Sequence, residues 1–126
     1  MEALTISAAN LNTIENNLGE VAKELNIKDA DLVVTGEGRL DGQSYMGKAP
    51  VGVAKLAKKY NKPVIAFSGC VTEEAINCND YGIDAFFPIV RKPCTLEEAM
   101  NINNAYKNLK DTAYQVFRLI KTYENK

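Results

Sequence analysis

Three charged side chains follow one another at two-residue intervals in a stretch of small and polar residues. Residues 36–48 read GEGRLDGQSYMGK, and Glu37, Arg39 and Asp41 are the charged members before the final lysine. Carboxylates can act as a general base or hold a magnesium ion beside a phosphate. A guanidinium group grips a carboxylate or a phosphate with paired hydrogen bonds. The stretch therefore predicts part of a pocket for a small anion, with these three side chains as candidate catalytic residues.

The same side chains have a purely structural alternative. Arg39 could pair with Glu37 or Asp41 and hold the segment together, and carboxylates in loops are usually solvated. The glycines favour a ligand, because Gly36 and Gly38 have no Cβ atom and can take positive φ angles that bring backbone N–H groups close to an anion. They do not form a dinucleotide fingerprint, since Asp41 stands where a third glycine is required.

A second glycine motif, Gly42-x-x-x-x-Gly47-Lys48, is close to a Walker A phosphate-binding loop. Ala49 replaces the serine or threonine that would bind magnesium, and the motif begins several residues after its predicted strand, so we reject that interpretation. Lys48 lies just before Pro50, which can open a helix. Its ammonium group could bind an anion near that helix or be solvated like an ordinary lysine.

Ser68 and Gly69 form the next candidate site. They follow the apolar run Pro63–Phe67 and predict a turn of small residues, which supplies amide groups to a ligand or only clears space for packing. Cys70 is a weak candidate nucleophile, because the chain has no histidine to activate it. The three cysteines are widely spaced, which argues against a disulfide framework and favours a reducing cytoplasm.

The elements that would position these residues alternate along the chain. Continuous apolar runs predict three short buried strands, at residues 31–35, 63–67 and 85–87. Periodic apolar residues and caps predict an amphipathic helix at 11–25, a helix opened by Pro50, a short helix capped by Thr72 and ended by Gly82, and one long helix from the Thr95–Glu98 capping box to Tyr123. Residues before Leu11 lack a period, and we expect them to be an irregular lead-in.

Strands that alternate with helices indicate an α/β fold. We expect a short parallel sheet of about three strands with flanking helices on both faces, three layers in all. Ligands bind beyond the carboxyl ends of such strands, where the segments 35–48, 68–72 and 88–95 would meet. Three strands are few for a sheet with two exposed edges. A second copy therefore completes the sheet, or the chain is a piece of something larger.

Composition limits the ligands. The 126 residues suffice for one domain, and 15 basic against 16 acidic side chains give a net charge of −1. No broad basic face is predicted, which argues against nucleic acid and membrane surfaces as ligands. The first residues have no signal-peptide pattern, and the longest strongly apolar run, Ala85–Val90, is too short for a membrane helix. We expect a cytoplasmic protein.

Several of these motifs together resemble the C-terminal part of bacterial glycerate kinases. The longest is DADLVVTGEGRLDGQ at residues 29–43, and GKAPVGVA follows it at 47–54. Three shorter strings continue the match in the same order: KPVI at 62–65, YGIDA at 81–85 and TLEEA at 95–99. The similarity runs from Asp29 to Tyr123, most of the chain.

The resemblance implies a Rossmann-like α/β domain that is incomplete here, with residues 31–126 as its C-terminal part and residues 1–30 as a lead-in with an amphipathic helix. It implies that ATP and a divalent metal ion such as Mg²⁺ are used to phosphorylate D-glycerate. Five side chains would line the cleft: Glu37, Arg39, Asp41, Gln43 and Lys48. Arg39 would hold the glycerate carboxylate or the transferring phosphoryl group, and Asp41 or Glu37 would orient the attacking hydroxyl group or the metal ion.

We therefore expect a C-terminal fragment of a glycerate kinase that carries part of the active site and does not turn over alone. The remainder of the kinase, or a second copy, would cover the sheet edge. The alternative is a small stand-alone α/β module that binds an anionic metabolite or a partner subunit without catalysis.

Overall fold

Parallel strands form the centre of the fold. The computed structural model describes residues 3–7, 26–41 and 49–125. Within these residues the sheet has four strands: β1 (Ala3–Ser7), β2 (Leu32–Leu40), β3 (Val64–Val71) and β4 (Ala85–Pro88). They are hydrogen-bonded in the order β1-β2-β3-β4, and each neighbouring pair is parallel. Parallel neighbours need crossover connections, which helices supply in α/β folds.

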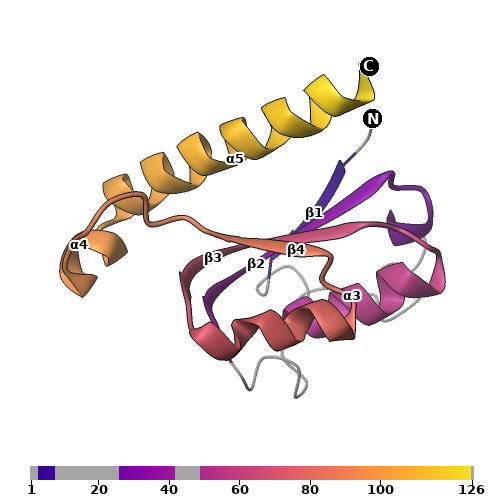
Figure 1. The fold of residues 1–126 in the computed structure, drawn as a ribbon, viewed down its shortest axis with the longest axis horizontal. Helices are drawn as coiled ribbons and strands as arrows, with labels where there is room; N and C mark the ends of the chain where they lie inside the picture. The colour runs from indigo at the N-terminus through magenta and orange to yellow at the C-terminus, as the bar shows by residue number, and fades with distance from the viewer. Residues whose placement is uncertain (1–2, 8–25, 42–48, 126) are drawn as a thin grey trace.

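Helices cover both faces of the sheet (Figure 1). The helical elements after β2 are α3 (Ala49–Lys59), the 3₁₀ helix η1 (Glu73–Tyr81), α4 (Leu96–Met100) and α5 (Ile102–Glu124). Val33 and Val64 pack on one face with side chains of α3 and η1. Val34 and Ile65 pack on the other face against Val116 of α5. The expected α/β class, a parallel sheet between two helical layers, is confirmed.

One strand was not expected from the sequence. Residues 3–7 form β1, and Thr5 pairs with Val34 in the middle of β2, so the irregular lead-in predicted here is wrong for this segment. Five residues are too short for their own pattern to reveal a strand, and a long-range pairing with β2 decides their conformation. The helix predicted at 11–25 lies outside the described residues.

Strands β2 and β3 extend well beyond the ends predicted for them. Gly36 was expected to stop the first strand and Ser68 and Gly69 to form a turn after the second, yet β2 continues to Leu40 and β3 to Val71. The two strands continue because they pair with each other, with Glu37 opposite Ser68. A paired hydrogen-bond ladder overrides the low strand propensity of glycine.

The C-terminal region also departs from the single long helix predicted for it. The capping box at Thr95 is present, with the Thr95 hydroxyl accepting from the Glu98 N–H, but the helix that it opens ends at Met100. Asn101 caps the next helix, α5, and its side chain accepts from the N–H groups of Asn103 and Asn104. An asparagine side chain competes for backbone hydrogen bonds, which favours a break at this position.

The caps of η1 are partly as predicted. Thr72 occupies the N-terminal cap position, but its hydroxyl makes no capping hydrogen bond. Gly82 ends the element in the left-handed conformation, with φ at 101°, which a residue without a Cβ atom adopts at little cost. The cysteines are free thiols, with Cys78 buried and Cys70 and Cys94 exposed. None of the described helices is both long enough and apolar enough to cross a membrane.

Candidate active site

A cavity of about 240 Å³ lies at the carboxyl-terminal ends of β2 and β3. We call it the strand-end cavity, and it is lined by Val34, Thr35, Gly36, Glu37, Phe67, Ser68, Gly69, Ile89 and Leu109. Its walls come from two neighbouring strands, the segment after β4 and one residue of α5. Ligands in open α/β sheets bind at this end of the strands.

Four predicted site residues meet in the strand-end cavity. Gly36 and Glu37 come from β2, and Ser68 and Gly69 come from β3. The Oε1 atom of Glu37 accepts a hydrogen bond from the N–H of Gly38 at 3.0 Å. This hydrogen bond holds the carboxylate against the backbone of β2, beside a cavity whose own lining is almost entirely apolar.

The glycines at this edge serve close packing of the two strands. Gly36 and Gly38 do not have the positive φ angles proposed for them, because among the described residues only Asn61 and Gly82 do. A Cβ atom built on Gly69 would lie 2.9 Å from the carbonyl oxygen of Gly38. Of the two roles proposed for Gly69, clearing space for packing is the one that this contact supports.

Ser68 is held inside the sheet. Its side chain is buried, and its hydroxyl donates to the carbonyl oxygen of Cys70 in the same strand. The Ser68 carbonyl oxygen accepts from the N–H of Ile89 at 2.8 Å, which ties the segment after β4 to β3. Ser68 thus connects two walls of the strand-end cavity and fixes their spacing.

Arg39 and Asp41 lie together but outside this cavity. The Nε atom of Arg39 is 3.7 Å from Oδ2 of Asp41, and the arginine side chain is 64% exposed while the aspartate is 21% exposed. This is the local ion pair that the sequence left open as an alternative. Arg39 follows Glu37 by two residues on β2, so it lies on the same strand as the cavity residues Gly36 and Glu37. The predicted binding residues Gln43 and Lys48 lie outside the described residues.

Side chains of β2 and β3 change from one face of the sheet to the other near these residues. Val34 belongs to the core cluster that includes Val116 of α5, whereas Leu40 belongs to the one that includes side chains of α3, although their positions differ by an even number. Side chains whose positions differ by an even number normally share a face of a strand. Phe67 and Val71 of β3 show the same reversal. Both strands therefore change the core cluster that their side chains join between these positions, in the region that contains Gly38 and Gly69.

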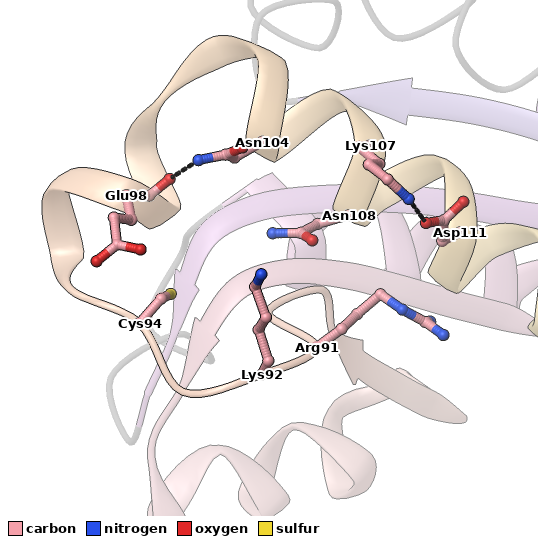
Figure 2. A pocket seen from close by; sticks show the side chains of 8 residues that line it. All are labelled: Arg91, Lys92, Cys94, Glu98, Asn104, Lys107, Asn108 and Asp111. Atoms are coloured by element: carbon pink, nitrogen blue, oxygen red, sulfur yellow. Dashed lines mark hydrogen bonds and ion pairs between the residues drawn. The ribbon is translucent and has the colours of Figure 1, made fainter.

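A second cavity was missed by the sequence reasoning. We call it the polar cavity; its volume is about 440 Å³, and it is lined by Arg91, Lys92, Cys94, Glu98, Asn104, Lys107, Asn108 and Asp111 (Figure 2). Two signals could have found it. Arg91 and Lys92 directly follow the apolar run Ala85–Val90, and polar residues at positions 104, 107, 108 and 111 repeat with helical spacing.

Charged groups in the polar cavity partly neutralise one another. Lys107 donates to Oδ2 of Asp111 at 2.6 Å, one turn further along α5. This hydrogen bond is the main reason why the pKa of Asp111 lies below its ordinary value, and the nearby positive charge of Arg91 lowers the pKa further. Glu98 accepts from the N–H of Thr95 at 3.3 Å as part of the capping box.

Comparison with known proteins decides the family. The model of the glycerate kinase family matches residues 3–121. The chain belongs to the glycerate kinase family. It is 49% identical over 94 residues to a glycerate kinase from Haemophilus influenzae, an alignment that covers 75% of this chain and 24% of that protein. It is 48% identical over 86 residues to glycerate 2-kinase from Escherichia coli K12, covering 68% of this chain and 22% of that protein.

A solved structure agrees with this glycerate kinase assignment. The crystal structure of a protein from Salmonella typhimurium LT2, provisionally named glycerate kinase 2, superposes with a TM-score of 0.64 at 39% sequence identity. It covers 93% of this chain but only 28% of that one. This chain therefore spans about a quarter of the length of the glycerate kinases it matches, and both cavities lie within the matched residues 3–121.

Proposed function

We propose that this chain is the C-terminal part of an enzyme that phosphorylates D-glycerate with ATP, and that it forms one wall of the active site. The observation that carries the proposal is the strand-end cavity, where Glu37 lies beside Gly36, Ser68 and Gly69. These residues belong to the segment through which the chain matches the glycerate kinase family. Residues 31–126 would then be the C-terminal part of its Rossmann-like domain.

The charged side chains beside the cavity suit a kinase with a small hydroxy-acid substrate, although the cavity lining itself is almost entirely apolar. Phosphoryl transfer needs positioning of the two substrates and neutralisation of charge, and little covalent work by the protein. In our proposal Glu37 orients the attacking hydroxyl group of glycerate. Arg39, two residues further along β2, binds the glycerate carboxylate or the transferring phosphoryl group. Asp41 orients Arg39 through their ion pair.

The carboxylates also fit one kind of magnesium site. Among the described residues no three side chains of histidine, cysteine, aspartate or glutamate gather closely enough to hold a metal ion. Magnesium in kinases is typically held by one or two carboxylates together with substrate phosphates. Glu37 or Asp41 would supply such a carboxylate when Mg²⁺ arrives with ATP, and the ion would neutralise phosphate charge.

The isolated chain should bind the substrates weakly and not turn over. It aligns with 24% of the length of the Haemophilus influenzae glycerate kinase, so about three quarters of that enzyme have no counterpart in the alignment. We propose that the remainder of the kinase, or a second copy, covers the edge strands β1 and β4. The free thiols fit the expected cytoplasmic location.

A chimeric enzyme tests the proposal. The residues of the Haemophilus influenzae glycerate kinase that align with this chain are replaced by the chain's own, and ATP-dependent phosphorylation of D-glycerate is measured. We expect activity in the chimera, and a fall in kcat of roughly 100-fold or more after Glu37→Gln, the usual scale for a lost general base. Glu73→Gln, at an exposed position of η1, is the matched control and should leave kcat unchanged.

Two results would contradict the proposal. A folded chimera without kinase activity would favour the stand-alone binding module instead. Full activity of the Glu37→Gln chimera would show that the strand-end cavity does not perform the chemistry.

A further inference from the structure

The polar cavity lies between two elements at the carboxyl-terminal edge of the sheet. Its floor is the segment after β4, which carries Arg91, Lys92 and Cys94, and its opposite wall is the first part of α5. Figure 2 shows the side chain of Lys92 extending from this segment toward Asn108 of α5. The cavity volume of about 440 Å³ is in the range that small-molecule sites have in other proteins.

The carboxylates that line this cavity are already engaged. Asp111 accepts from Lys107 at 2.6 Å. Glu98 accepts from both the N–H and the hydroxyl group of Thr95. These hydrogen bonds are local to α5 and to the start of α4. Asp111 also feels the positive charge of Arg91 on the facing segment, which contributes to its lowered pKa.

The basic residues of that segment lack such carboxylate partners. Lys92 forms no hydrogen bond or ion pair with any residue in the described part of the chain, and its side chain lines the cavity. Arg91 donates from Nη1 to the Thr112 hydroxyl at 3.3 Å, a neutral partner that fixes the direction of the guanidinium group. Three basic side chains (Arg91, Lys92 and Lys107) and two acidic ones (Glu98 and Asp111) line the cavity, so it has an excess of positive charge, and Lys92 is the basic group without a partner there among the described residues.

We propose that the polar cavity binds a small anion through a phosphate or carboxylate group, with Lys92 and Arg91 as the main contacts. Charge-assisted hydrogen bonds from ammonium and guanidinium groups are the strong interactions in such sites. Asn108 faces the same space and adds an amide donor. The chemical class is a phosphorylated or carboxylated metabolite, and the site is distinct from the residues that we propose for catalysis.

The two cavities adjoin along the same elements. Ile89 and Leu109 line the strand-end cavity, while Arg91 and Asn108 line the polar cavity. An anion held by Lys92 would therefore lie beside the proposed active site. The inference goes beyond the kinase activity and does not depend on it, because the anion can be detected by binding alone.

Direct titration tests the proposal on the chain of 126 residues. Isotope-labelled chain is titrated with sodium phosphate, and separately with sodium acetate, at constant ionic strength while amide NMR shifts are followed. We expect saturable shifts that centre on residues 91–94 and 104–108. Phosphate binding without acetate binding identifies a phosphate ligand, equal binding of both identifies the carboxylate class, and either result supports the site.

Substitutions distinguish a specific anion-binding site from a general effect of the protein's charge. Lys92→Gln, which removes the unpaired charge, should weaken phosphate binding about tenfold, the usual scale for one charge-assisted hydrogen bond. Arg91→Gln should weaken it to a similar extent. Lys121→Gln, at an exposed position in the last turn of α5, is the matched control and should change the dissociation constant less than about twofold.

Three outcomes would overturn the inference. These are the absence of saturable binding of either anion, equal weakening by Lys92→Gln and Lys121→Gln, and shifts that centre on Glu37 and Ser68 instead of the polar cavity. Amide spectra of each variant report whether it remains folded. Because the readout is binding, a negative result here leaves the chimera test of kinase activity unaffected.

Discussion

The backbones of Gly38 and Gly69 approach so closely that a methyl group on Gly69 would lie 2.9 Å from the Gly38 carbonyl oxygen. The two glycines stand between paired positions, since Glu37 is opposite Ser68 and Arg39 is opposite Cys70. The contact involves main-chain atoms on both sides, and it therefore cannot be relieved by rotating a side chain. It lies next to the strand-end cavity, so the spacing of the strands there depends on it.

Gly69→Ala should therefore destabilise the fold. Relief of the clash requires the two strands to separate locally, which we expect to lower the free energy of unfolding by about 1–3 kcal/mol, as overpacking of a core does. Gly52→Ala is the matched control, because Gly52 lies on α3 and a Cβ atom there meets nothing within 4 Å. Alanine in that helix should stabilise the protein by about 0.5–1 kcal/mol. Urea unfolding curves measure both, and equal stability of the two variants would contradict the packing role of Gly69.

Asp84 holds the start of β3 to the segment before β4. Its Oδ2 atom accepts from the backbone N–H of Val64 at 2.7 Å and also from Nζ of Lys58. Asp84→Ala leaves the N–H of Val64, a fully buried residue, without this acceptor. We expect a loss of about 1–3 kcal/mol in the free energy of unfolding, the usual cost of an unsatisfied buried polar group.

Lys58→Met is the control for the charge of this pair. It removes the ammonium group but leaves Val64 bonded to Asp84, so the loss should be below about 1 kcal/mol, as for other partly exposed ion pairs. Thermal or urea unfolding distinguishes the two variants. Because Asp84→Ala removes both interactions, equal losses in the two variants would show that the ion pair, and not the backbone hydrogen bond, stabilises this connection.

Arg39 offers a test of substrate binding in the chimeric kinase. Its side chain is mostly exposed, so Arg39→Lys should leave the stability of the fold nearly unchanged. We expect KM for D-glycerate to rise about tenfold, because lysine keeps the charge but loses the paired hydrogen bonds to a carboxylate. Arg118→Lys, on α5 beside Tyr114, is the control. An unchanged KM in Arg39→Lys would limit Arg39 to its ion pair with Asp41.

Local patterns predicted those parts of the fold whose conformation is decided locally. The continuous apolar runs in β2 and β3, the Thr95 capping box and the glycine at position 82 all have their physical cause within a few residues. Strand β1 and the extension of β2 past Gly36 depend on pairing with another strand. No local pattern encodes such pairing.

The candidate sites also contain residues that local sequence patterns predicted and residues that they missed. Type and spacing selected Glu37, Arg39 and Asp41 as candidates, and of these three only Glu37 lines the strand-end cavity. The polar cavity was missed because Lys92 and Asn108 meet only when α5 packs on the sheet. The break at Asn101 also mattered, since it sets where α5 begins and therefore which of its side chains face the segment after β4.

The pKa of Asp111 provides a test of the polar cavity that needs no ligand. The hydrogen bond from Lys107 favours the ionised carboxylate, so Asp111 should titrate below its ordinary value of 3.8. The stabilisation of α5 by this pair is then present above pH 3.8 and is lost as the pH falls through the lower pKa of the folded state. NMR titration of the Asp111 side chain measures the midpoint.

Lys107→Gln should raise the midpoint, and Lys110→Gln, which removes only a more distant charge, should raise it less. A midpoint at or above 3.8 in the unmodified chain would show that Asp111 does not neutralise Lys107, and the charge balance of the polar cavity would then change.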